Sequence, residues 1–535
     1  MERKARPQDA TTKFFLEIPM DSPDSSPAKT ATEAIQRGAR FHTNTQVRDL
    51  GCWATDMSCI FFVTPMMIIA WYITGAKIDE AYVVELIRFM FNYQNPENGG
   101  WPTYLEEEPS PMGTTLAYIA LRLVGVPGHD EHLLKARSFY LKHGGADHLP
   151  GWAKFWLALL GLYNWANTDP YPVEMWLLPE WVPGMQSMSV HGGHAWNTSL
   201  VLQTLVYASL ANHRDFQDNV IQAHEWLLQQ QLVEEWDDSP SCHRPSRLGA
   251  WSFTTRYHGT PCSDCTAESL KAILLVEREM GIRRMSEKNL RLAVDNLLLI
   301  QNASGGYSSF EPIAAGEWLE YLNGTEVFGQ VMTEHDYAEC TSSCIVALAL
   351  FRDRNGEYRR REIDTAIERG VKYIETSQRD DGGWMASWGV TFTYGAFFAM
   401  EALHCGGRTY ENSPVVRLGC QFLLDMREPD GGWGEIIESR LLGQYVRAPR
   451  SHTVQTAWSC LALMYAGYPD QEPIKRGIQL IISRQKPNGK WDQEYPVGSG
   501  VLTCNIQYQN YIYIFPIRAL AMYEKIYGED LSLKG

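Results

Sequence analysis

The sequence lacks a cluster of Lys and Arg, a secretory leader and an apolar run long enough to cross a bilayer. Its net charge is −16 over 535 residues, and without a basic cluster we expect no nucleic-acid partner. The first residues carry charges but no apolar signal-peptide core, so we expect no secretory signal. The most apolar stretch, residues 59–74, contains Pro65 and is shorter than the roughly 20 residues of a membrane span. It predicts a buried helix.

Strand-like alternation is almost absent, and the cysteines follow no regular spacing. The 11 cysteines are odd in number and scattered, which favours reduced thiols over a disulfide framework. Hydrophobic residues make up 45% of the chain and charged residues 21%, so the chain can bury a large core and is not disordered as a whole. Aromatic residues are abundant at 12%, with 18 Trp among them.

One short motif recurs along the chain. A helix ends in Gln, a Gly-rich turn follows, and Trp or Tyr closes the turn. The copies occupy residues 88–101, 369–384, 417–433 and 476–491, with degenerate copies at 37–53 and 301–307. Arg427 stands in place of Gln in the third copy. Several of the aromatic ends lie roughly 50 residues apart, a period that suits pairs of helices.

The repeated motif has a structural explanation. Glycine lets the chain leave a helix with positive φ, and the aromatic ring covers the helix end. Apolar residues with helical periodicity lie between the copies, as in 266–278 and 454–466. A single helix pair cannot bury its apolar face alone, so the pairs are predicted to stack and close into a ring. We interpret the motif as scaffold.

A second group of motifs resembles those of the oxidosqualene cyclases in the terpene cyclase/mutase family, and the repeat resembles their QW motif. These motifs are SDCTAE at 263–268, GAWSF at 249–253, ECTS at 339–342, SWGVTFTYG at 387–395 and PVEMWLLP at 172–179. The DxDD motif of squalene–hopene cyclases is absent. The resemblance runs from about residue 36 to the C-terminus and is greatest to members of the lanosterol synthase type.

The resemblance implies an all-α fold built from two α/α barrels, a toroid of QW repeats. We predict an N-terminal segment at 1–35, a truncated first α/α barrel at 36–184 and a complete catalytic α/α barrel at 185–535. The first barrel is predicted to be truncated because Gly184 and Met185 join directly where the family carries a long segment. In the family that segment holds a histidine that helps to end the reaction, and lanosterol synthases have its Tyr partner at the position of Phe310.

Asp264 is the predicted general acid. Opening an epoxide requires a protonated acid in a dry cavity, and burial keeps a carboxyl neutral because desolvation disfavours its anion. By resemblance, Cys265 and Cys340 hydrogen-bond to Asp264, and as weak donors they would stabilise its conjugate base. Glu268 would bond behind the acid or serve the start of the helix. Asp264 also fits a helix N-cap, which is its alternative role.

Aromatic side chains are expected to stabilise the migrating positive charge. Cation–π attraction contributes about 0.5–2 kcal/mol for each desolvated ring, and a ring does not trap the cation as water would. By resemblance, the family's cavity positions are matched by Trp196, Phe253, Phe310, Trp388 and Tyr394. Each of these residues also suits an ordinary core position.

The resemblance implies an isomerase, an intramolecular transferase that converts 2,3-oxidosqualene to a sterol-like or other triterpenoid without a metal or other cofactor. The insolubility of that substrate implies peripheral contact with the endoplasmic reticulum membrane or a lipid droplet, on the cytosolic side. Two alternatives stay open. One is a catalytically impaired paralogue that binds an isoprenoid lipid or a partner without turnover. The other is a barrel like the β subunit of protein prenyltransferases, which needs an Asp/Cys/His zinc site.

A zinc pattern is present only in weak form. Cys262 and Cys265 are separated by two residues, and Cys340 and Cys344 by three. No histidine ligand pattern accompanies them, and two of the four belong to the cyclase motifs. We therefore predict no metal.

Overall fold

The computed structural model describes residues 26–47, 49–54, 60–104, 107–168, 193–236, 244–323, 329–500 and 504–528. These residues are mostly helical, and their one sheet is an antiparallel hairpin of β1 (Gly498–Gly500) and β2 (Cys504–Ile506). The predicted all-α fold is confirmed. The motif at 172–179 and the junction of Gly184 with Met185 lie outside the described residues.

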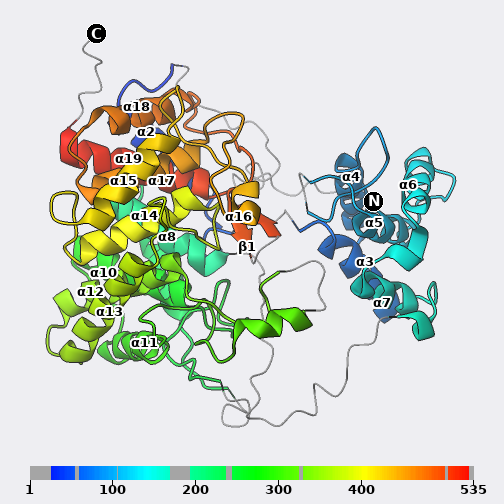
Figure 1. The fold of residues 1–535 in the computed structure, drawn as a ribbon, viewed down its shortest axis with the longest axis horizontal. Coiled ribbons are helices and arrows are strands. Elements are labelled where there is room, and N and C mark those ends of the chain that lie inside the picture. The colour runs from blue at the N-terminus through cyan, green and yellow to red at the C-terminus, as the bar shows by residue number, and fades with distance from the viewer. Residues whose placement is uncertain are drawn as a thin grey trace.

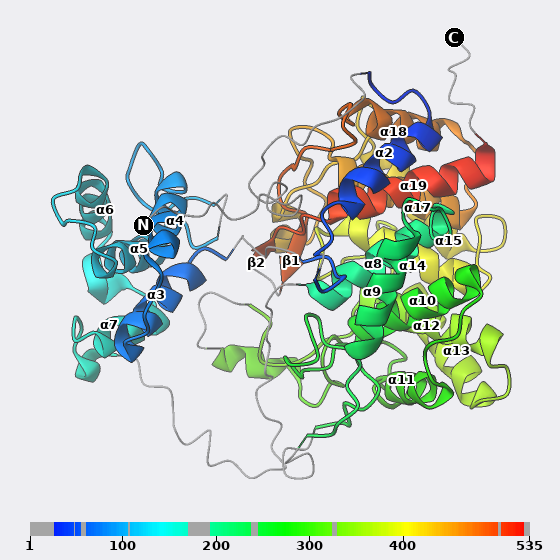
Figure 2. The same ribbon diagram turned by 180° about the vertical axis from the view of Figure 1, so that it is seen from behind.

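Six of the described helices form a closed inner ring. Each packs against the next, and the last packs against the first (Figures 1 and 2). In ring order they are α8 (His194–Tyr207), α10 (Ser263–Met280), α12 (Ala338–Arg354), α14 (Phe392–Cys405), α17 (Thr453–Ala466) and α19 (Tyr511–Tyr527). Most of their residues are buried, because one side faces the interior of the ring and the other faces a second layer of helices.

That second layer covers the ring from outside. Its helices are α9 (Gln217–Gln229), α11 (Glu287–Leu299), α13 (Arg360–Thr376), α15 (Pro414–Met426), α18 (Glu472–Ser483) and α2 (Ala31–Thr43). The first five each pack on two neighbouring inner helices, and α2 packs on α19 and α18. They are amphipathic: α18, for example, buries Ile474, Ile478, Ile481 and Ile482, which share one helical face.

The position of α2 differs from the predicted domain division. The boundary drawn at residue 36 falls inside this helix, and the residues after it were assigned to the truncated first barrel. Instead, α2 lies beside α19 as part of the C-terminal barrel (Figure 2). The barrel that carries the acid motif is therefore completed by the N-terminal helix of the described chain.

The Gln–Trp repeats fasten the outer helices to one another. The Gln amide donates one hydrogen bond within its own turn and one to a backbone carbonyl at the next outer helix. The second set of bonds, 2.9–3.0 Å long, runs from Gln46 to Asn219, Gln231 to Asn289, Gln301 to Ala366, Gln378 to Val415 and Gln485 to Ala34. The last bond joins α18 to α2. Together they form a nearly complete circuit around the barrel.

Two details of this circuit were not predicted. The copies ending at Trp53 and Tyr307, interpreted as degenerate, make the same Gln bonds as the intact copies. A further copy joins Gln231 to Trp251, whose Nε1 donates to the Leu227 carbonyl; an insertion between Gln and Gly hides it in the sequence. Arg427 occupies the remaining step, between α15 and α18.

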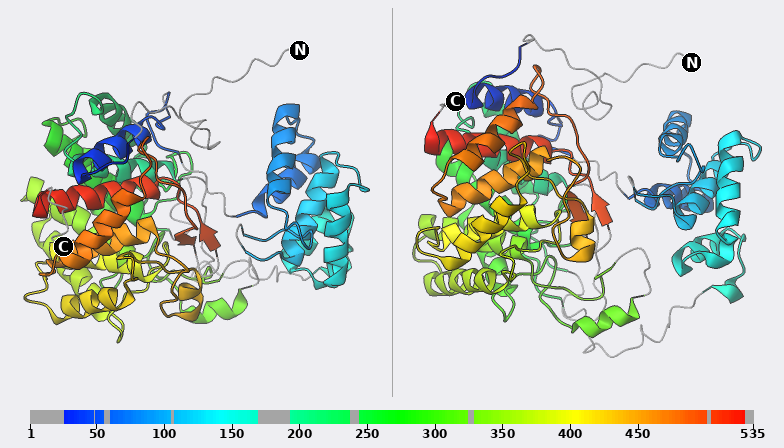
Figure 3. Two further views of the ribbon diagram at one scale, coloured as in Figure 1. Left: turned by 90° about the horizontal axis from the view of Figure 1, so that it is seen from above. Right: turned by 45° about the horizontal axis from the view of Figure 1, so that its top comes forward.

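A separate group of helices stands beside the barrel (Figures 1 and 3). It consists of α3 (Val63–Thr74), α4 (Glu80–Asn92), α5 (Pro111–Leu123), α6 (Glu131–Lys142) and α7 (Gly151–Leu159). Its α5 packs on α3 and α6, and the amide of Gln94 bonds to the His132 carbonyl in α6 as in the barrel repeats. The predicted helix of the apolar stretch is α3, but it buries only one face, and Tyr72 is 61% exposed. Among the described helices none has the length and apolarity that a bilayer crossing requires.

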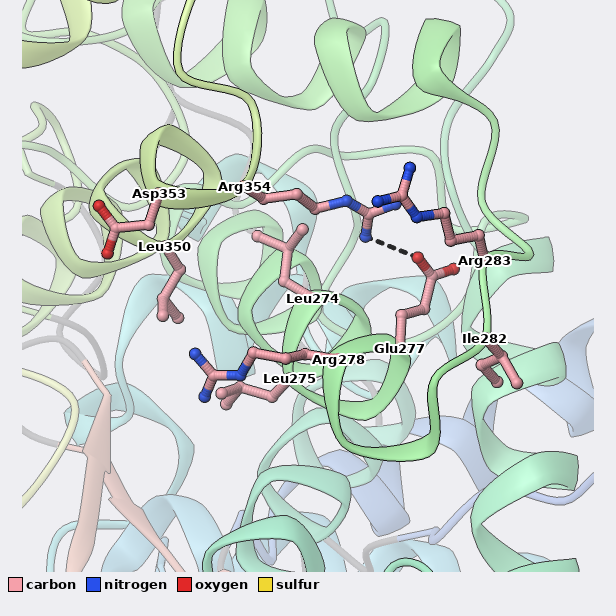
Figure 4. Close-up of a pocket in the computed structure, with 9 residues that line it drawn as sticks. All are labelled: Leu274, Leu275, Glu277, Arg278, Ile282, Arg283, Leu350, Asp353 and Arg354. Atoms are coloured by element: carbon pink, nitrogen blue, oxygen red, sulfur yellow. Dashed lines mark hydrogen bonds and ion pairs between the residues drawn. The ribbon is translucent and has the colours of Figure 1, made fainter.

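A pocket of about 300 Å³ opens at the C-terminal ends of α10 and α12 (Figure 4). Leu274 and Leu275 form apolar parts of its lining, and Arg354 donates to Glu277 across 2.6 Å. At 1.5 Å per residue, this pocket lies roughly 15–20 Å along α10 from its N-terminal end. It is therefore remote from Asp264, which lies in the first turn of that helix.

Candidate active site

Asp264 lies at the start of α10, inside the barrel. The extended Cys262 is the residue before the helix, and Asp264 is in its first turn. The N-cap position thus belongs to Cys262, and not to Asp264. The Asp264 side chain is almost buried, with 8% exposure of the residue. It lies where the first turn of α10 meets the 307–310 segment, since the Ser263 N–H donates to the Ser309 carbonyl at 2.7 Å.

The surroundings of Asp264 favour its neutral form. Burial raises the pKa of the carboxyl and outweighs the hydrogen bonds from Cys262 and Cys265, which lower it; the nearby charge of Glu268 raises it further. Oδ1 accepts the Cys262 thiol at 3.0 Å and the Cys265 backbone N–H at 2.7 Å. Because both donors bond to Oδ1, Oδ2 is the oxygen suited to carry a transferable proton.

Cys265 adjoins the acid and its backbone N–H bonds to Oδ1, whereas the Cys340 thiol contacts Ser309 in place of the bond predicted to Asp264. Burial raises the pKa of the Cys265 thiol, and contacts with Cys262 and Asp264 raise it further. The pKa of Cys340, on α12, is likewise raised by burial and by the Asp264 charge. Its Sγ lies 3.5 Å from the Ser309 Oγ. The sequence analysis assigned no role at the acid to Cys262 or Ser309, although Cys262 lies only two residues before Asp264.

Three ligand-type atoms gather at the acid. Those of Cys262, Asp264 and Cys265 lie within 4.8 Å of one another. In the part of the chain that the structure describes, this group includes no histidine and neither Cys340 nor Cys344. The four-cysteine zinc pattern considered from the sequence is therefore not assembled as one ligand set.

One aromatic wall is formed by Trp388 and Phe310. Their rings meet edge to face, with centroids 5.9 Å apart, and the Tyr337 ring lies 6.4 Å from Trp388. Trp388 Nε1 donates to the Ser309 Oγ at 2.5 Å. Since the Ser309 carbonyl accepts the N–H next to Asp264, this one serine connects the aromatic wall to the acid helix.

The other three predicted aromatic residues belong to a second, larger cluster. Trp196 packs near Phe253, with centroids 6.5 Å apart, and its Nε1 donates to the Tyr511 hydroxyl at 2.8 Å. Trp458 lies between Tyr394 and Tyr511: the centroid of its ring is 4.9 Å from that of Tyr394 and 6.1 Å from that of Tyr511. Burial raises the pKa of Tyr394, and the charge of Asp264 contributes to that rise, so the acid and this cluster share one interior.

Tyr508, Tyr511 and Trp458 were missed by the sequence analysis. The Tyr508 ring stacks on the Tyr511 ring with centroids 4.4 Å apart, and its centroid lies 6.4 Å from that of Phe253. The charges of Asp264 and Cys265 contribute to the raised pKa of Tyr508, after burial and the neighbouring Tyr511. These residues lie near the start of α19 and on α17, outside the motifs that carried the prediction. The only available signal was their high aromatic density.

Glu268 lies one helical turn after Asp264, and both of its carboxylate oxygens accept hydrogen bonds. Its Oε1 accepts Lys271 Nζ at 2.9 Å and the Ser343 hydroxyl at 2.6 Å, and its Oε2 accepts the Gln203 amide at 2.6 Å. The side chain is 1% exposed. These bonds join Glu268 to α8 and α12, and its role behind the acid stays a prediction.

Glu268 is part of a buried charged layer, which we define as Glu268, Lys271, Glu401 and Arg518. Lys271 Nζ lies 3.5 Å from Glu401 Oε2, and Arg518 donates to Glu401 Oε1 at 2.5 Å. The Tyr465 hydroxyl, 2.6 Å from Arg518, completes the contacts. With Gln203, Ser343 and Tyr465, these residues come from all six inner helices, so the layer ties the barrel together across its interior.

Comparison with protein families identifies the chain. Residues 193–525 match the squalene-hopene cyclase C-terminal domain, and residues 35–322 match the squalene-hopene cyclase N-terminal domain. Among solved structures, the fold is similar to that of ent-copalyl diphosphate synthase from Streptomyces platensis. The TM-score is 0.54 at 14% identity, with 91% of this chain and 98% of that chain covered.

Curated relatives agree with the family models. The chain is 34% identical to lanosterol synthase of Pneumocystis carinii, over 98% of this chain and 95% of the relative. It is 32% identical to lanosterol synthase erg7A of Aspergillus fumigatus, over 99% and 93%, and 31% identical to terpene cyclase/mutase ntnI of Nectria sp., over 99% and 93%. The chain belongs to the terpene cyclase/mutase family, within its oxidosqualene cyclases.

Proposed function

We propose that this chain is a triterpene cyclase that protonates the epoxide of 2,3-oxidosqualene and guides the resulting cation to a sterol-like or other polycyclic triterpenoid. The observation that carries the proposal is the buried Asp264, whose pKa is raised by its surroundings, inside a barrel that holds two aromatic clusters. The names of the relatives, lanosterol synthases and terpene cyclases, support the reaction class. The reaction is an isomerisation and consumes no co-substrate.

Initiation follows from the two oxygens of Asp264. The proton leaves Oδ2 for the epoxide oxygen, a C–O bond of the epoxide breaks, and the neighbouring double bond closes on the electron-deficient carbon. The carboxylate left behind keeps the Cys262 thiol and the Cys265 N–H on Oδ1. Hydrogen bonds to the charged form lower the pKa of the acid at the moment of transfer. The same donors thus make Asp264 a stronger acid than burial alone would allow.

The aromatic clusters then act on the cation. Trp388 and Phe310 supply one group of rings and the cluster from Trp196 to Tyr394 supplies another, so several π-faces inside the barrel are available to a folded polyene. Each desolvated ring contributes about 0.5–2 kcal/mol of attraction to a cation within about 6 Å. The reaction ends when the last cation loses a proton, and Phe310 has no hydroxyl to accept it.

Asp264→Asn is the test of this proposal. Wild-type protein incubated with 2,3-oxidosqualene should give a cyclised triterpenoid by gas chromatography and mass spectrometry. The variant should lose at least about 10²–10⁴-fold in rate, the usual contribution of a general acid. Asp295→Asn is a matched control, because Asp295 pairs with Arg359 on the outer helices.

The pH dependence gives a second readout. Only protonated Asp264 is active and its pKa is raised, so kcat should fall as pH rises, with its midpoint above the ordinary Asp value of about 3.9. Substrate binding by wild type without any product would instead support the impaired paralogue. Unchanged product from Asp264→Asn would refute the assignment of the acid.

We also propose peripheral contact with a membrane or lipid droplet, on the grounds of the insoluble substrate. Large apolar side chains exposed on the α3–α7 group support it, including Tyr72, Leu162 and Trp165 at 61%, 60% and 51% exposure. Purified protein should co-sediment with phosphatidylcholine vesicles, and replacing Leu162 and Trp165 by Ser should reduce the bound fraction. Equal binding by the variant would count against this surface.

A further inference from the structure

The loop that carries Trp388 is held by a buried glutamate. Glu339 lies in the first turn of α12, directly before Cys340, and is 1% exposed. Its Oε1 accepts the backbone N–H of Ser387 at 2.6 Å and that of Trp388 at 2.9 Å. One carboxylate oxygen therefore fixes the peptide unit that immediately precedes the Trp388 side chain.

The opposite edge of the same loop is held by the β-hairpin. The Ser499 N–H donates to the Trp388 carbonyl at 3.3 Å, and the Ser499 hydroxyl donates to the Ser387 carbonyl at 2.8 Å. The Val390 N–H donates to the Val497 carbonyl at 2.8 Å. The N–H groups of residues 387 and 388 thus face Glu339, while their carbonyls face Ser499, and the backbone has little freedom to rotate.

The Trp388 ring is then directed by its own polar atom. Nε1 bonds to Ser309, which places the ring edge to face with Phe310. Both the backbone and the ring of Trp388 therefore connect to elements that touch the acid. The segment from Tyr337 to Cys340 makes three contributions. The Tyr337 ring contacts Trp388, Glu339 accepts the backbone N–H groups of the loop, and the pKa of the Cys340 thiol is raised in part by the Asp264 charge.

From this geometry we propose that Glu339 is a positioning residue that sets the place of the Trp388 ring relative to the cation, and so the point at which cyclisation stops. This inference rests on the proposed function. Cation–π attraction depends on the distance from the ring centroid, and a misplacement of about 1 Å in an active site can cost about 10²-fold in rate. Loosening the clamp should therefore change which products form more than how tightly substrate binds.

Glutamate is needed here as an acceptor and not as a charge. Burial raises the pKa of Glu339 despite the backbone N–H groups that lower it, so a neutral side chain is compatible with the site. Its Oε2 is buried and has no hydrogen-bond partner in the described residues. Glutamine keeps an oxygen able to accept both N–H bonds, whereas alanine removes it and aspartate withdraws it by one methylene.

Amide hydrogen exchange tests the clamp without any need for turnover. Peptides covering residues 386–390 should exchange about tenfold faster or more in Glu339→Ala than in wild type, because the N–H groups of Ser387 and Trp388 lose their acceptor. Glu339→Asp should be intermediate and Glu339→Gln close to wild type. Unchanged exchange in Glu339→Ala or, if that variant does not fold, in Glu339→Asp would overturn the proposal, whatever the protein catalyses.

Product analysis tests the consequence. With 2,3-oxidosqualene, Glu339→Ala should lower kcat and raise the share of partially cyclised products, with KM changed less than about threefold, and Glu339→Gln should restore the wild-type product ratio. Glu494→Ala is the matched control, since that part-buried glutamate accepts the Thr453 N–H at 2.7 Å at the start of α17; its products should stay as in wild type. If Glu339→Gln changed the ratio of products as much as Glu339→Ala does, that result would also overturn the proposal. Absence of any product from wild type would refute the proposed function and leave the exchange result to decide on the clamp.

Discussion

Replacing Arg518 by Met should destabilise the barrel strongly, although it deletes no residue of the proposed chemistry. Arg518 is 3% exposed, and its guanidinium bonds to Glu401 at 2.5 Å and to the Tyr465 hydroxyl at 2.6 Å. It also lies over the Tyr207 ring, 4.7 Å from the centroid. Methionine matches part of its volume but leaves Glu401 with Lys271 as its remaining cation in the charged layer.

The size of the effect follows from the uncompensated charge. Removing one partner of a buried ion pair costs about 3–5 kcal/mol, and the lost cation–π contact adds about 0.5–2 kcal/mol. Burial by itself would raise the pKa of Glu401, but Lys271 and Arg518 together lower it to about 2. The carboxylate therefore stabilises the wild-type fold above its ordinary pKa of 4.5, and that contribution is lost as pH falls from 4.5 towards 2. In Arg518→Met this acid-dependent loss should shrink.

A double-mutant cycle with Glu401→Gln separates the pair from general damage. The melting temperatures of wild type, both single variants and the double variant should show the double variant more stable than the sum of the singles, by about 0.5–3 kcal/mol. Arg214→Met is the surface control, because Arg214 is 91% exposed in its pair with Asp215, and should stay within about 0.5 kcal/mol of wild type. An Arg518→Met protein as stable as wild type, or strictly additive effects, would refute the reasoning.

Two further predictions concern stability. Burial outweighs the backbone N–H donors at Glu334 and raises the pKa of its carboxyl to about 7, so the fold should lose stability as pH rises from 4.5 to 7. In Glu334→Gln the melting temperature should change less over that pH range. Parallel plots of melting temperature against pH for the variant and the wild type would contradict this. Arg427→Gln should supply the missing amide between α15 and α18 and stabilise the barrel by about 0.5–1.5 kcal/mol, measured as a higher melting temperature. Gln378→Arg is its reverse control and should be less stable; a lower melting temperature for Arg427→Gln would show that the circuit does not limit stability at that step.

The repeat could be predicted because its chemistry is local. Gln485, the glycine at 489 and Trp491 lie within a few residues of one another, and they bond within one turn. Asp264 could be placed at a helix start for the same reason. The hydrogen bond from Cys262 could not be predicted in this way. It depends on the extended backbone just before α10, which directs the thiol to Oδ1 of Asp264.

The charged layer and the closure by α2 depend on contacts between distant parts of the chain. Glu268 and Arg518 are separated by most of the barrel sequence, and no spacing rule connects them. A signal was present: Arg518 and Glu401 each stand among apolar neighbours in their helices, where an unpaired charge would be too costly. That pattern predicts that Arg518 and Glu401 each have a charged partner. It does not identify the partner, because the two helices come together only when the ring of helices is closed.

The helix that completes the outer layer, α2, precedes its partner α19 by nearly the whole barrel sequence. Thr32 bonds to Glu524, 492 residues further along the chain. At a bacterial or eukaryotic synthesis rate of about 5–20 residues per second, α2 emerges from the ribosome roughly 25–100 s before α19 exists. Throughout that interval α2 lacks the α19 surface on which it packs, and the nascent barrel is an open arc. The inner and outer layers can therefore close into a ring only after α19 has been made, because α2 and α19 pack on each other from opposite ends of the barrel sequence.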